Sequence, residues 1–340
     1  MVFSRALVVS EFRPEHSNPG VRLRHAHVRA WLTEQGIDVT EAYLWDTNGA
    51  SKLQRGLGAR RGAGLLRGVS STDTAVIVLG LCAPHMLGLA SRYARHHAVV
   101  FDACDSWIGQ VSSRARQFRV GLVAPALVGA VRQPASSRRL AISYISERDR
   151  VRDQVLNRGR AAFVIPPAAP RGLAALGPVR FPLERVVMAA DLGSFHNKLG
   201  FSWFLRSALQ LADELPVRFE VYGPVPPREP LPPNMRYFGW VDSIRSIYEG
   251  DTGVVVPNLA GSGVPNKLLE AAASGRPAVV HRSWEDCRVP PTLRWSFDDP
   301  RSLTDAIRSM VDGSGGSIAS ANLGRAVGLT LEDVLGRAWG

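Results

Sequence analysis

Short apolar, β-branched segments alternate with helical segments along most of this 340-residue chain, and this alternation restricts the possible folds more than any other feature. Strands that alternate with helices at such spacing indicate parallel βαβ units, and two series of them are present. The first series has expected strands at 6–10, 38–44, 74–79, 98–102, 140–145 and 163–165, and expected helices at 21–35, 84–95 and 147–157. The second has expected strands at 185–190, 217–222, 235–238, 252–257, 278–280 and 294–297, and expected helices at 200–214, 241–250, 265–274 and 302–312.

A stretch rich in proline and alanine, residues 166–172, separates the two series and is typical of a linker. We therefore predict an α/β protein of two doubly wound, Rossmann-like domains, residues 1–168 and 180–316, facing each other across a ligand cleft. A chain of 340 residues is long enough for two such cores. The tail, residues 317–340, follows a glycine- and serine-rich patch, and its expected helix is a candidate to pack back on the first domain.

The composition is that of a globular protein, with 45% hydrophobic and 21% charged residues. No stretch reaches the roughly 18–20 apolar residues that cross a bilayer. The N-terminus lacks the basic and long apolar regions of a signal peptide, so we interpret it as a first strand. Cys82, Cys104 and Cys287 are scattered, which argues against a disulfide framework or a zinc site and predicts a cytoplasmic protein.

The formal net charge of +11 suggests an anionic partner such as a phosphorylated ligand, a membrane surface or nucleic acid. A compositional bias of the source genome explains the same charge equally well. Residues 114–139 contain an apolar run, 120–131, flanked by arginines. They are interpreted as a packing helix before the fifth strand, with the alternative of an interfacial helix that contacts anionic lipid on the inner membrane face.

The segment 252–280 combines a strand, a glycine loop, a helix and a second strand. Gly261 and Gly263 let the backbone approach a ligand closely. Pro265 suits the first position of a helix, and Gly275 suits its end. The loop therefore directs a helix N-terminus to the carboxyl end of a parallel strand, where free N–H groups and the helix dipole favour an anion such as a diphosphate.

Polar side chains follow on the first turns of this helix. Asn266 and Lys267 are four and three residues from Glu270, so each shares a helix face with it. A carboxylate one turn behind an anion site is placed to accept hydrogen bonds from ribose, and Lys267 can neutralise a phosphate. The alternative is an ordinary ion pair between Lys267 and Glu270 on a solvated face, which a short glycine motif does not exclude.

This stretch resembles the donor-binding segment of the GT-B glycosyltransferases, in particular the GT4-like family of group 1 glycosyl transferases. Those enzymes carry a glycine-rich loop, a helix ending in Leu-Glu-Ala, and a turn that contains Gly-x-Pro-Val-Val. The matching residues are 261–271 and 275–280. Further agreement, which is weaker in the first domain, covers residues 190–198, 203–205, 219–223, 236–241, 99–107 and 142–147.

The resemblance implies that Glu270 binds the ribose of a nucleotide-sugar donor. It also implies that Lys267 or Lys198 offsets the phosphate charge and that Gly239 and Trp240 lie near the base. The other expected donor-binding residues are Gly193, Asn197, Gly223, Gly261, Ser262, Gly263, Val264, Pro265 and Asn266. Many family members have a glutamate at the position of Ser262, which touches the donor sugar, so the identity of the sugar stays open.

The donor base also stays open, with UDP-, GDP- and dTDP-sugars as the candidates. The donor is a substrate, and no bound cofactor is expected. No Asp-x-Asp motif follows a strand, so no metal is required.

In the first domain, the loop and helix after the first strand carry His16, Arg22, Arg24 and His25. These residues face the cleft in a fold of this kind, and Arg22 and Arg24 are candidates to contact the diphosphate or an anionic acceptor. The alternative for each is an ordinary residue of an amphipathic helix. His16 belongs to the same acceptor or phosphate group.

Asp102 and Asp105 follow the fourth strand, also on the cleft side, and Asp102 joins the acceptor or phosphate group. If transfer inverts the anomeric centre, Asp105 or His25 is the candidate general base. Retention, which the resemblance favours, needs no protein nucleophile and places the demand on groups that stabilise the leaving diphosphate, Lys267 among them.

The sequence thus predicts a glycosyltransferase that moves a sugar from a nucleotide sugar to a hydroxyl acceptor. The acceptor is a polysaccharide or lipid-linked precursor or a small natural product. A nucleotide-sugar epimerase of the same fold is one alternative, and a non-catalytic basic protein that binds anions or nucleic acid is another. No nucleic-acid partner is expected, because the arginines are spread along the chain and no recognition motif is present.

Overall fold

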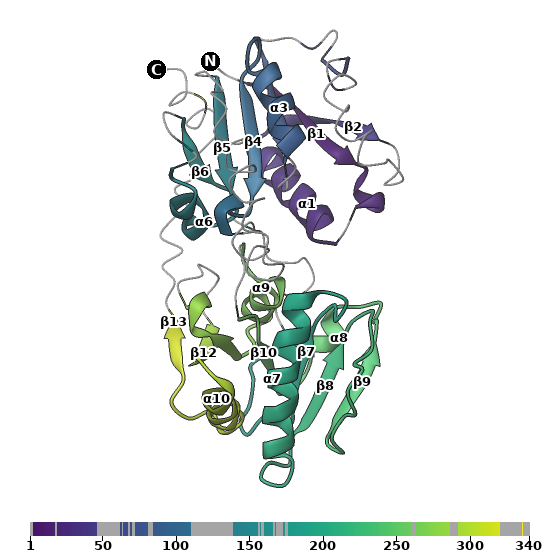
Figure 1. Cartoon of the computed structure of the whole chain (residues 1–340), viewed down its shortest axis with the longest axis vertical. Coiled ribbons are helices and arrows are strands. Elements are labelled where there is room, and N and C mark those ends of the chain that lie inside the picture. The colour runs from purple at the N-terminus through teal and green to yellow at the C-terminus, as the bar shows by residue number, and fades with distance from the viewer. Residues whose placement is uncertain are drawn as a thin grey trace, which may run out of the picture. The chain divides into compact units, whose positions relative to one another are not determined.

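The computed structural model contains two compact units, residues 1–168 with 326–340 and residues 169–325 (Figure 1). The described residues are 3–17, 19–45, 62, 64–66, 69, 72–80, 84–109, 139–155, 157, 160–165, 167, 173, 176–259, 263–285, 292–319 and 335. The segment 110–138, Gly261, Ser262 and most of the tail lie outside them.

Unit 1 is built on a six-stranded parallel sheet in the order β2-β1-β3-β4-β5-β6. The strands are β1 Arg5–Phe12, β2 Asp38–Trp45, β3 Thr74–Leu79, β4 Val99–Cys104, β5 Leu140–Tyr144 and β6 Ala162–Val164. The helices whose bounds the described residues define in this unit are α1 Pro19–Thr33, α3 Pro84–Tyr93 and α6 Glu147–Arg152, with a 3₁₀ turn η1 at Pro14–His16. This is the predicted Rossmann-like arrangement.

The two faces of this sheet are covered by different helices. Every residue of β3, β4 and β5 is buried, as is usual for central strands of a parallel sheet. Alternate residues point to opposite faces, so Leu7 packs with α3 and Val8 packs with α1. Leu335 from the tail is buried in the same cluster as Val8.

Unit 2 contains a seven-stranded sheet in the order β13-β12-β11-β10-β7-β8-β9, with all strands parallel except β13. The strands are β7 Arg185–Ala189, β8 Arg218–Tyr222, β9 Met235–Gly239, β10 Thr252–Val256, β11 Ala278–His281, β12 Thr292–Phe297 and β13 Ser317–Ala319. The helices are α7 Phe195–Leu211, α8 Arg245–Tyr248, α9 Asn266–Ala273 and α10 Pro300–Asp312, with a 3₁₀ turn η2 at Arg282–Trp284.

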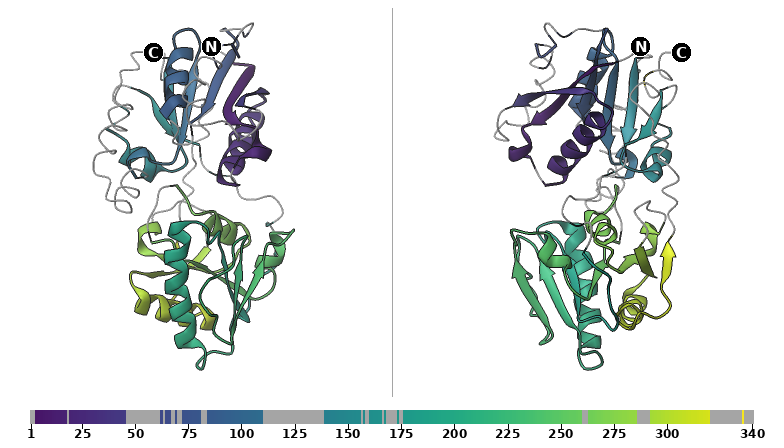
Figure 2. Two further views of the ribbon diagram at one scale, coloured as in Figure 1. Left: turned by 45° about the vertical axis from the view of Figure 1, so that its right-hand side comes forward. Right: turned by 180° about the vertical axis from the view of Figure 1, so that it is seen from behind.

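The helices of unit 2 form two layers around the sheet, which the two views of Figure 2 show from different sides. Residues of α7 and α10 share one buried cluster with the sheet, and residues of α8 and α9 share another. The prediction of two Rossmann-like α/β folds is therefore confirmed.

Some elements differ from the sequence expectation, among them α7 and β13. The predicted helix 200–214 begins earlier, at Phe195, so Gly200 lies inside α7 and not at its start. A Cβ at Gly200 would lie 2.2 Å from the carbonyl oxygen of Pro257, so the glycine permits close packing of α7 on the end of β10. The short strand β13, which was not predicted, pairs with β12 in the glycine- and serine-rich patch.

Candidate functional site

The strand order of unit 2 reverses between β7 and β10. The chain proceeds from β7 through β8 to β9 on one side, and β10 then starts the other side. Loops that leave the carboxyl ends of strands at such a reversal diverge, and ligands of open α/β sheets bind there. The loops after β7 and β10 are therefore the natural place for a site in this unit.

The loop after β10 leads into α9 as the sequence predicted. Gly263 has a φ of 78°, which favours glycine, and Val264 is buried. Pro265 occupies the N-cap of α9 and forms no capping bond through its side chain. The first N–H groups of an α-helix have no partner within the helix, and in α9 these include the N–H groups of Asn266 and Lys267.

Lys267 connects the loops on either side of the reversal. Its side chain is 8% exposed, and its Nζ donates to Oδ1 of Asn258 at 2.9 Å and to Oδ1 of Asn197 at 3.1 Å. Asn197 belongs to α7, which follows β7, and Asn258 follows β10. Burial lowers the pKa of Lys267 to about 8, and the charge of Glu270 partly opposes this shift.

Glu270 has a partner of its own. The hydroxyl of Tyr248, in α8, donates to Oε2 of Glu270 at 2.5 Å. Burial raises the pKa of Glu270, while the hydrogen bond from Tyr248 and the charge of Lys267 act in the opposite direction. In the described part of the chain no salt bridge joins Lys267 to Glu270, and Lys267 is buried. The alternative of a solvated ion pair therefore does not describe this helix face.

The loops after β8 and β9 lie along the same edge of the sheet. Gly223 has a φ of 152°, and a Cβ there would lie 1.9 Å from the carbonyl oxygen of Ala190. Its N–H donates to the carbonyl of Gly239 at 2.9 Å, and Tyr237 donates to its carbonyl at 2.6 Å. Trp240, directly after β9, is 72% exposed, so it is free to contact a ligand.

Gly193, Asn197 and Lys198 follow β7. The N–H of Gly193 donates to Asp191, and the amide of Asn197 donates to the carbonyl of Asp191 at 2.9 Å. Lys198 is exposed. The structure thus places the described donor-site candidates of unit 2 after β7, β8, β9 and β10, at the carboxyl ends of these strands.

Asn258 and Tyr248 are functional candidates that the sequence reasoning missed. Asn258 is a polar residue two positions after the buried strand β10, a signal that could have identified it. Tyr248 precedes Glu270 by 22 residues, and no local periodicity connects the two.

In unit 1, Arg24 and Asp102 are 1% and 0% exposed and bind each other. The guanidinium donates to both carboxylate oxygens, at 2.8 and 2.6 Å, and to the carbonyl of Ile165 at 2.7 Å. Ser143 also donates to Asp102, at 2.7 Å. These contacts attach α1 to the sheet inside unit 1 and occupy the polar groups of both side chains; the contact of Arg24 or Asp102 with a diphosphate or acceptor stays a prediction.

The other candidates of unit 1 lie on different elements. His16 in η1 and Arg22 in α1 are exposed. His25 is buried beside Tyr43, with 6.4 Å between the ring centroids, and burial lowers its pKa. Asp105 follows β4 and is half-buried. The preceding residue, Cys104, has a φ of 59°, which is uncommon for a residue with a side chain.

Among the described residues, no group of three or more His, Cys, Asp or Glu side chains is placed to hold a metal ion. Nor does any described helix have the length and apolar character needed to cross a membrane. The segment 114–138, which is the candidate for a lipid contact, lies outside the described residues.

Comparison with protein families identifies part of this chain. Residues 185–312 match the family model of glycosyl transferases group 1. This match covers β7 to α10 and confirms the resemblance seen in residues 261–280. No curated protein matches the chain.

Solved structures extend the likeness to both units. TarM of S. aureus matches with 14% identity and a TM-score of 0.55, over 82% of this chain but only 55% of TarM. A trehalose-6-phosphate synthase, studied for glycosyl transfer with retention, matches with 11% identity and a TM-score of 0.58, over 98% of this chain and 95% of its own. HepE of Anabaena, solved with UDP and glucose, matches with 14% identity and a TM-score of 0.55, over 98% and 97%.

Proposed function

We propose that this chain, which carries a group 1 glycosyltransferase domain on a GT-B fold, transfers a sugar from a nucleoside diphosphate sugar to a hydroxyl acceptor. The observation that carries the proposal is the arrangement at the carboxyl edge of unit 2. There an ammonium group, a helix N-terminus and a carboxylate lie within two turns of one helix.

The diphosphate of the donor would bind at the start of α9. The N–H groups of Asn266 and Lys267, in the first turn of α9, supply hydrogen-bond donors for phosphate oxygens. Lys267 supplies a positive charge whose hydrogen-bond acceptors, Asn197 and Asn258, are both neutral. Because neither contact neutralises the ammonium, its charge remains available to an anion.

The nucleoside would extend from the diphosphate along α9 and the loop after β9. Glu270 is a hydrogen-bond acceptor one turn into α9, at the position suited to ribose hydroxyls. Gly239 and the exposed Trp240 would lie against the base. The complexes of HepE with UDP and glucose make UDP the first nucleotide to test.

Transfer with retention fits this set of residues. The bond between the anomeric carbon and the phosphate oxygen breaks, and the acceptor oxygen forms its bond on the same face. The acceptor proton passes to the departing phosphate oxygen. The step needs no protein nucleophile, and Lys267 with the N-terminus of α9 stabilises the charge that develops on the diphosphate. The likeness to a trehalose-6-phosphate synthase studied for retention supports this choice.

The acceptor side is assigned to unit 1. Asp105 and the exposed His16 and Arg22 follow β4 and β1, and we assign them to the acceptor. His25 is buried, so it is better suited to support these residues than to contact the acceptor directly. The proposal includes a lipid-linked acceptor and a cytoplasmic protein that contacts the membrane at its periphery. Residues 114–139 are the candidate for that membrane contact.

The experiment that tests the proposal is calorimetric titration with UDP, GDP and dTDP, for the wild type, Glu270→Ala and the control Glu214→Ala. Glu214 is an exposed carboxylate of the same unit that pairs with Arg308. We expect one nucleotide to bind the wild type and the control equally, and Glu270→Ala to weaken it by at least about tenfold. A folded protein that binds none of the three would contradict the proposal.

A second assay separates transfer from the epimerase alternative. The bound nucleotide identifies the donor series, and its sugar derivatives are then incubated with the protein with and without candidate acceptors. Conversion of the nucleotide sugar into an isomer without any acceptor would indicate an epimerase, whereas acceptor-dependent release of the nucleotide supports transfer.

A further inference from the structure

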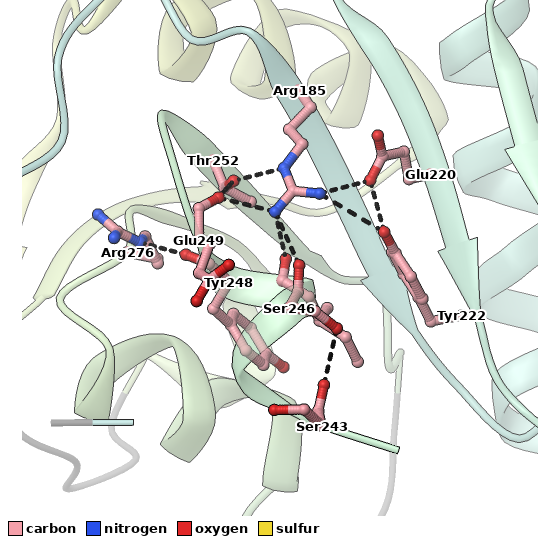
Figure 3. Close-up of polar contacts among 10 residues, drawn as sticks. Arg185, Glu220, Tyr222, Ser243, Ser246, Tyr248, Glu249, Thr252 and Arg276 are labelled. Carbon is pink, nitrogen blue, oxygen red and sulfur yellow. Dashed lines mark hydrogen bonds and ion pairs between the residues drawn. The ribbon is translucent and has the colours of Figure 1, made fainter. Parts of the chain in front are cut away.

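Helix α8 is only four residues long, yet its carbonyl groups are bound by arginine side chains (Figure 3). Nη2 of Arg185 donates to the carbonyls of Ser246, Ile247 and Glu249, at 3.0, 3.3 and 2.7 Å. Nε of Arg276 donates to the carbonyl between them, that of Tyr248, at 2.6 Å. Terminal helix carbonyls normally lack partners within the helix, and cations favour that end.

Arg185 is itself fixed by side chains of the sheet. Its Nε donates to Thr252 at 2.8 Å and its Nη1 to Glu220 at 2.8 Å, as Figure 3 shows. Arg276 also donates to the carbonyl of Leu176 at 2.8 Å. Two planar groups that cannot lose their charge therefore hold the backbone of residues 246–249. Arg185 is the first residue of β7 and also binds Thr252 at the start of β10, whereas Arg276 lies between α9 and β11.

Tyr248 extends from this fixed backbone into the interior. Its side chain is fully buried, and its hydroxyl finds an acceptor in Oε2 of Glu270. Among the described residues, Oε1 of Glu270 has no hydrogen-bond partner. A carboxylate can accept about four hydrogen bonds, so one oxygen held by Tyr248 leaves the other available.

We propose that Tyr248 is a positioning residue for the donor ribose: it fixes Glu270 through Oε2 so that Oε1 accepts the ribose hydroxyls, and Arg185 and Arg276 hold Tyr248 in place. The inference rests on the proposed function, because it takes Glu270 as the ribose-binding group. The hydrogen bond from Tyr248 also opposes the rise in the pKa of Glu270 that burial causes, and so favours the ionised form that accepts hydrogen bonds.

The test compares UDP with 2′,3′-dideoxy-UDP, which lacks the ribose hydroxyls, on the wild type and Tyr248→Phe. The control is Tyr43→Phe, which removes another tyrosine hydroxyl bound to a glutamate, Glu41, in unit 1. We expect Tyr248→Phe to lower the affinity for UDP about tenfold and to leave the affinity for dideoxy-UDP within about twofold of the wild-type value. Tyr43→Phe should leave both affinities unchanged.

A double variant strengthens the test. If Tyr248 acts through Glu270, adding Tyr248→Phe to Glu270→Ala should cost no further UDP affinity. Should Tyr248→Phe fail to fold, Tyr248→Met, which fills the volume with a flexible apolar chain and also lacks the hydroxyl, replaces it in the same titrations.

The outcomes distinguish a failure of the proposed role of Tyr248 from a failure of the proposed donor site. The positioning role is overturned if Tyr248→Phe loses affinity for UDP and for dideoxy-UDP equally, or loses affinity for neither. In that case Glu270→Ala should still abolish the preference for UDP over dideoxy-UDP. If the wild type binds UDP and dideoxy-UDP equally and Glu270→Ala behaves like the wild type, then the proposed donor site itself is wrong.

Discussion

Arg24 and Asp102, which are 78 residues apart in the chain, form a doubly hydrogen-bonded ion pair in the interior of unit 1. The carboxylate comes from β4 and the guanidinium from α1, so the pair attaches a helix to the sheet. A buried charge that loses its partner costs much more than a surface charge does, because no water replaces the lost contact.

We expect Asp102→Asn to destabilise unit 1 by about 3–5 kcal/mol, because Arg24 would remain buried without a counter-charge. The measurement is the guanidinium midpoint of the transition in which unit 1 unfolds. The matched control is Arg29→Gln, which breaks the exposed pair with Glu41 and should cost at most about 1 kcal/mol. Similar midpoints for the two variants would show that the pair has no structural importance.

The two glycines inside helices α7 and α3 should respond oppositely to alanine. At Gly200 a Cβ meets the carbonyl of Pro257 at 2.2 Å, whereas at Gly88 nothing lies within 4 Å. Gly88→Ala should stabilise the protein by about 0.5–1 kcal/mol, because alanine is the better helix former.

Gly200→Ala should destabilise unit 2 by at least about 2 kcal/mol, since backbone atoms have to move. It should also lower the affinity for UDP, because α7 carries Asn197 and the loop after β10 carries Asn258, the two residues that bind Lys267. Thermal unfolding and titration of both variants check this. A stabilised Gly200→Ala variant with normal affinity would refute the close packing of α7 on β10.

The affinity for UDP should fall as the pH rises through about 8, the pKa to which burial lowers Lys267. A nearby diphosphate favours the ammonium form and raises this pKa, so binding takes up a proton. Titrations in buffers of different ionisation enthalpy report the proton directly. In Lys267→Met the affinity should be lower and the proton uptake above about pH 7.5 should disappear.

Stability should follow the opposite trend in the same pH range. Between pH 8 and 10.5, the lowered and ordinary pKa values of Lys267, the unfolded chain binds more protons at this residue than the folded chain does. Stability contributed by Lys267 therefore rises with pH across this window. The check is the difference in unfolding free energy between the wild type and Lys267→Met; a difference that does not change with pH would show that Lys267 titrates normally.

Trp240→Ala should lower the affinity for UDP. The fold should be unaffected, because the side chain is 72% exposed. Stacking of a base on an aromatic side chain is worth about 1–3 kcal/mol, so the dissociation constant should rise at least about fivefold. Pyrophosphate, which has no base, should bind the variant and the wild type equally. An equal loss of affinity for UDP and for pyrophosphate would show that Trp240 does not contact the base.

The sequence predicted α9 and its flanking strands closely, because glycine and proline mark their ends locally. Residues 265–274 were expected as a helix, and α9 spans Asn266–Ala273. The predicted helix 241–250 shortens to Arg245–Tyr248. Arg185 and Arg276 bind the carbonyls at its end, and no local pattern reveals these partners, which are distant in the chain. The fate of Arg24 could not be predicted for the same reason, because a periodic helix does not reveal a partner 78 residues away.

Arg185 lies where β7 begins and Arg276 lies just before β11, while the proposed donor site lies where the strands of this sheet end. In the proposal, Glu270 is thus supported through Tyr248 by residues at the opposite ends of the strands from the donor. If the donor site is as proposed, substitutions at Arg185 or Arg276 should change donor affinity through Tyr248 and Glu270 without removing a group that touches the donor. A mutational screen for altered donor use should therefore recover positions outside the site as well as within it.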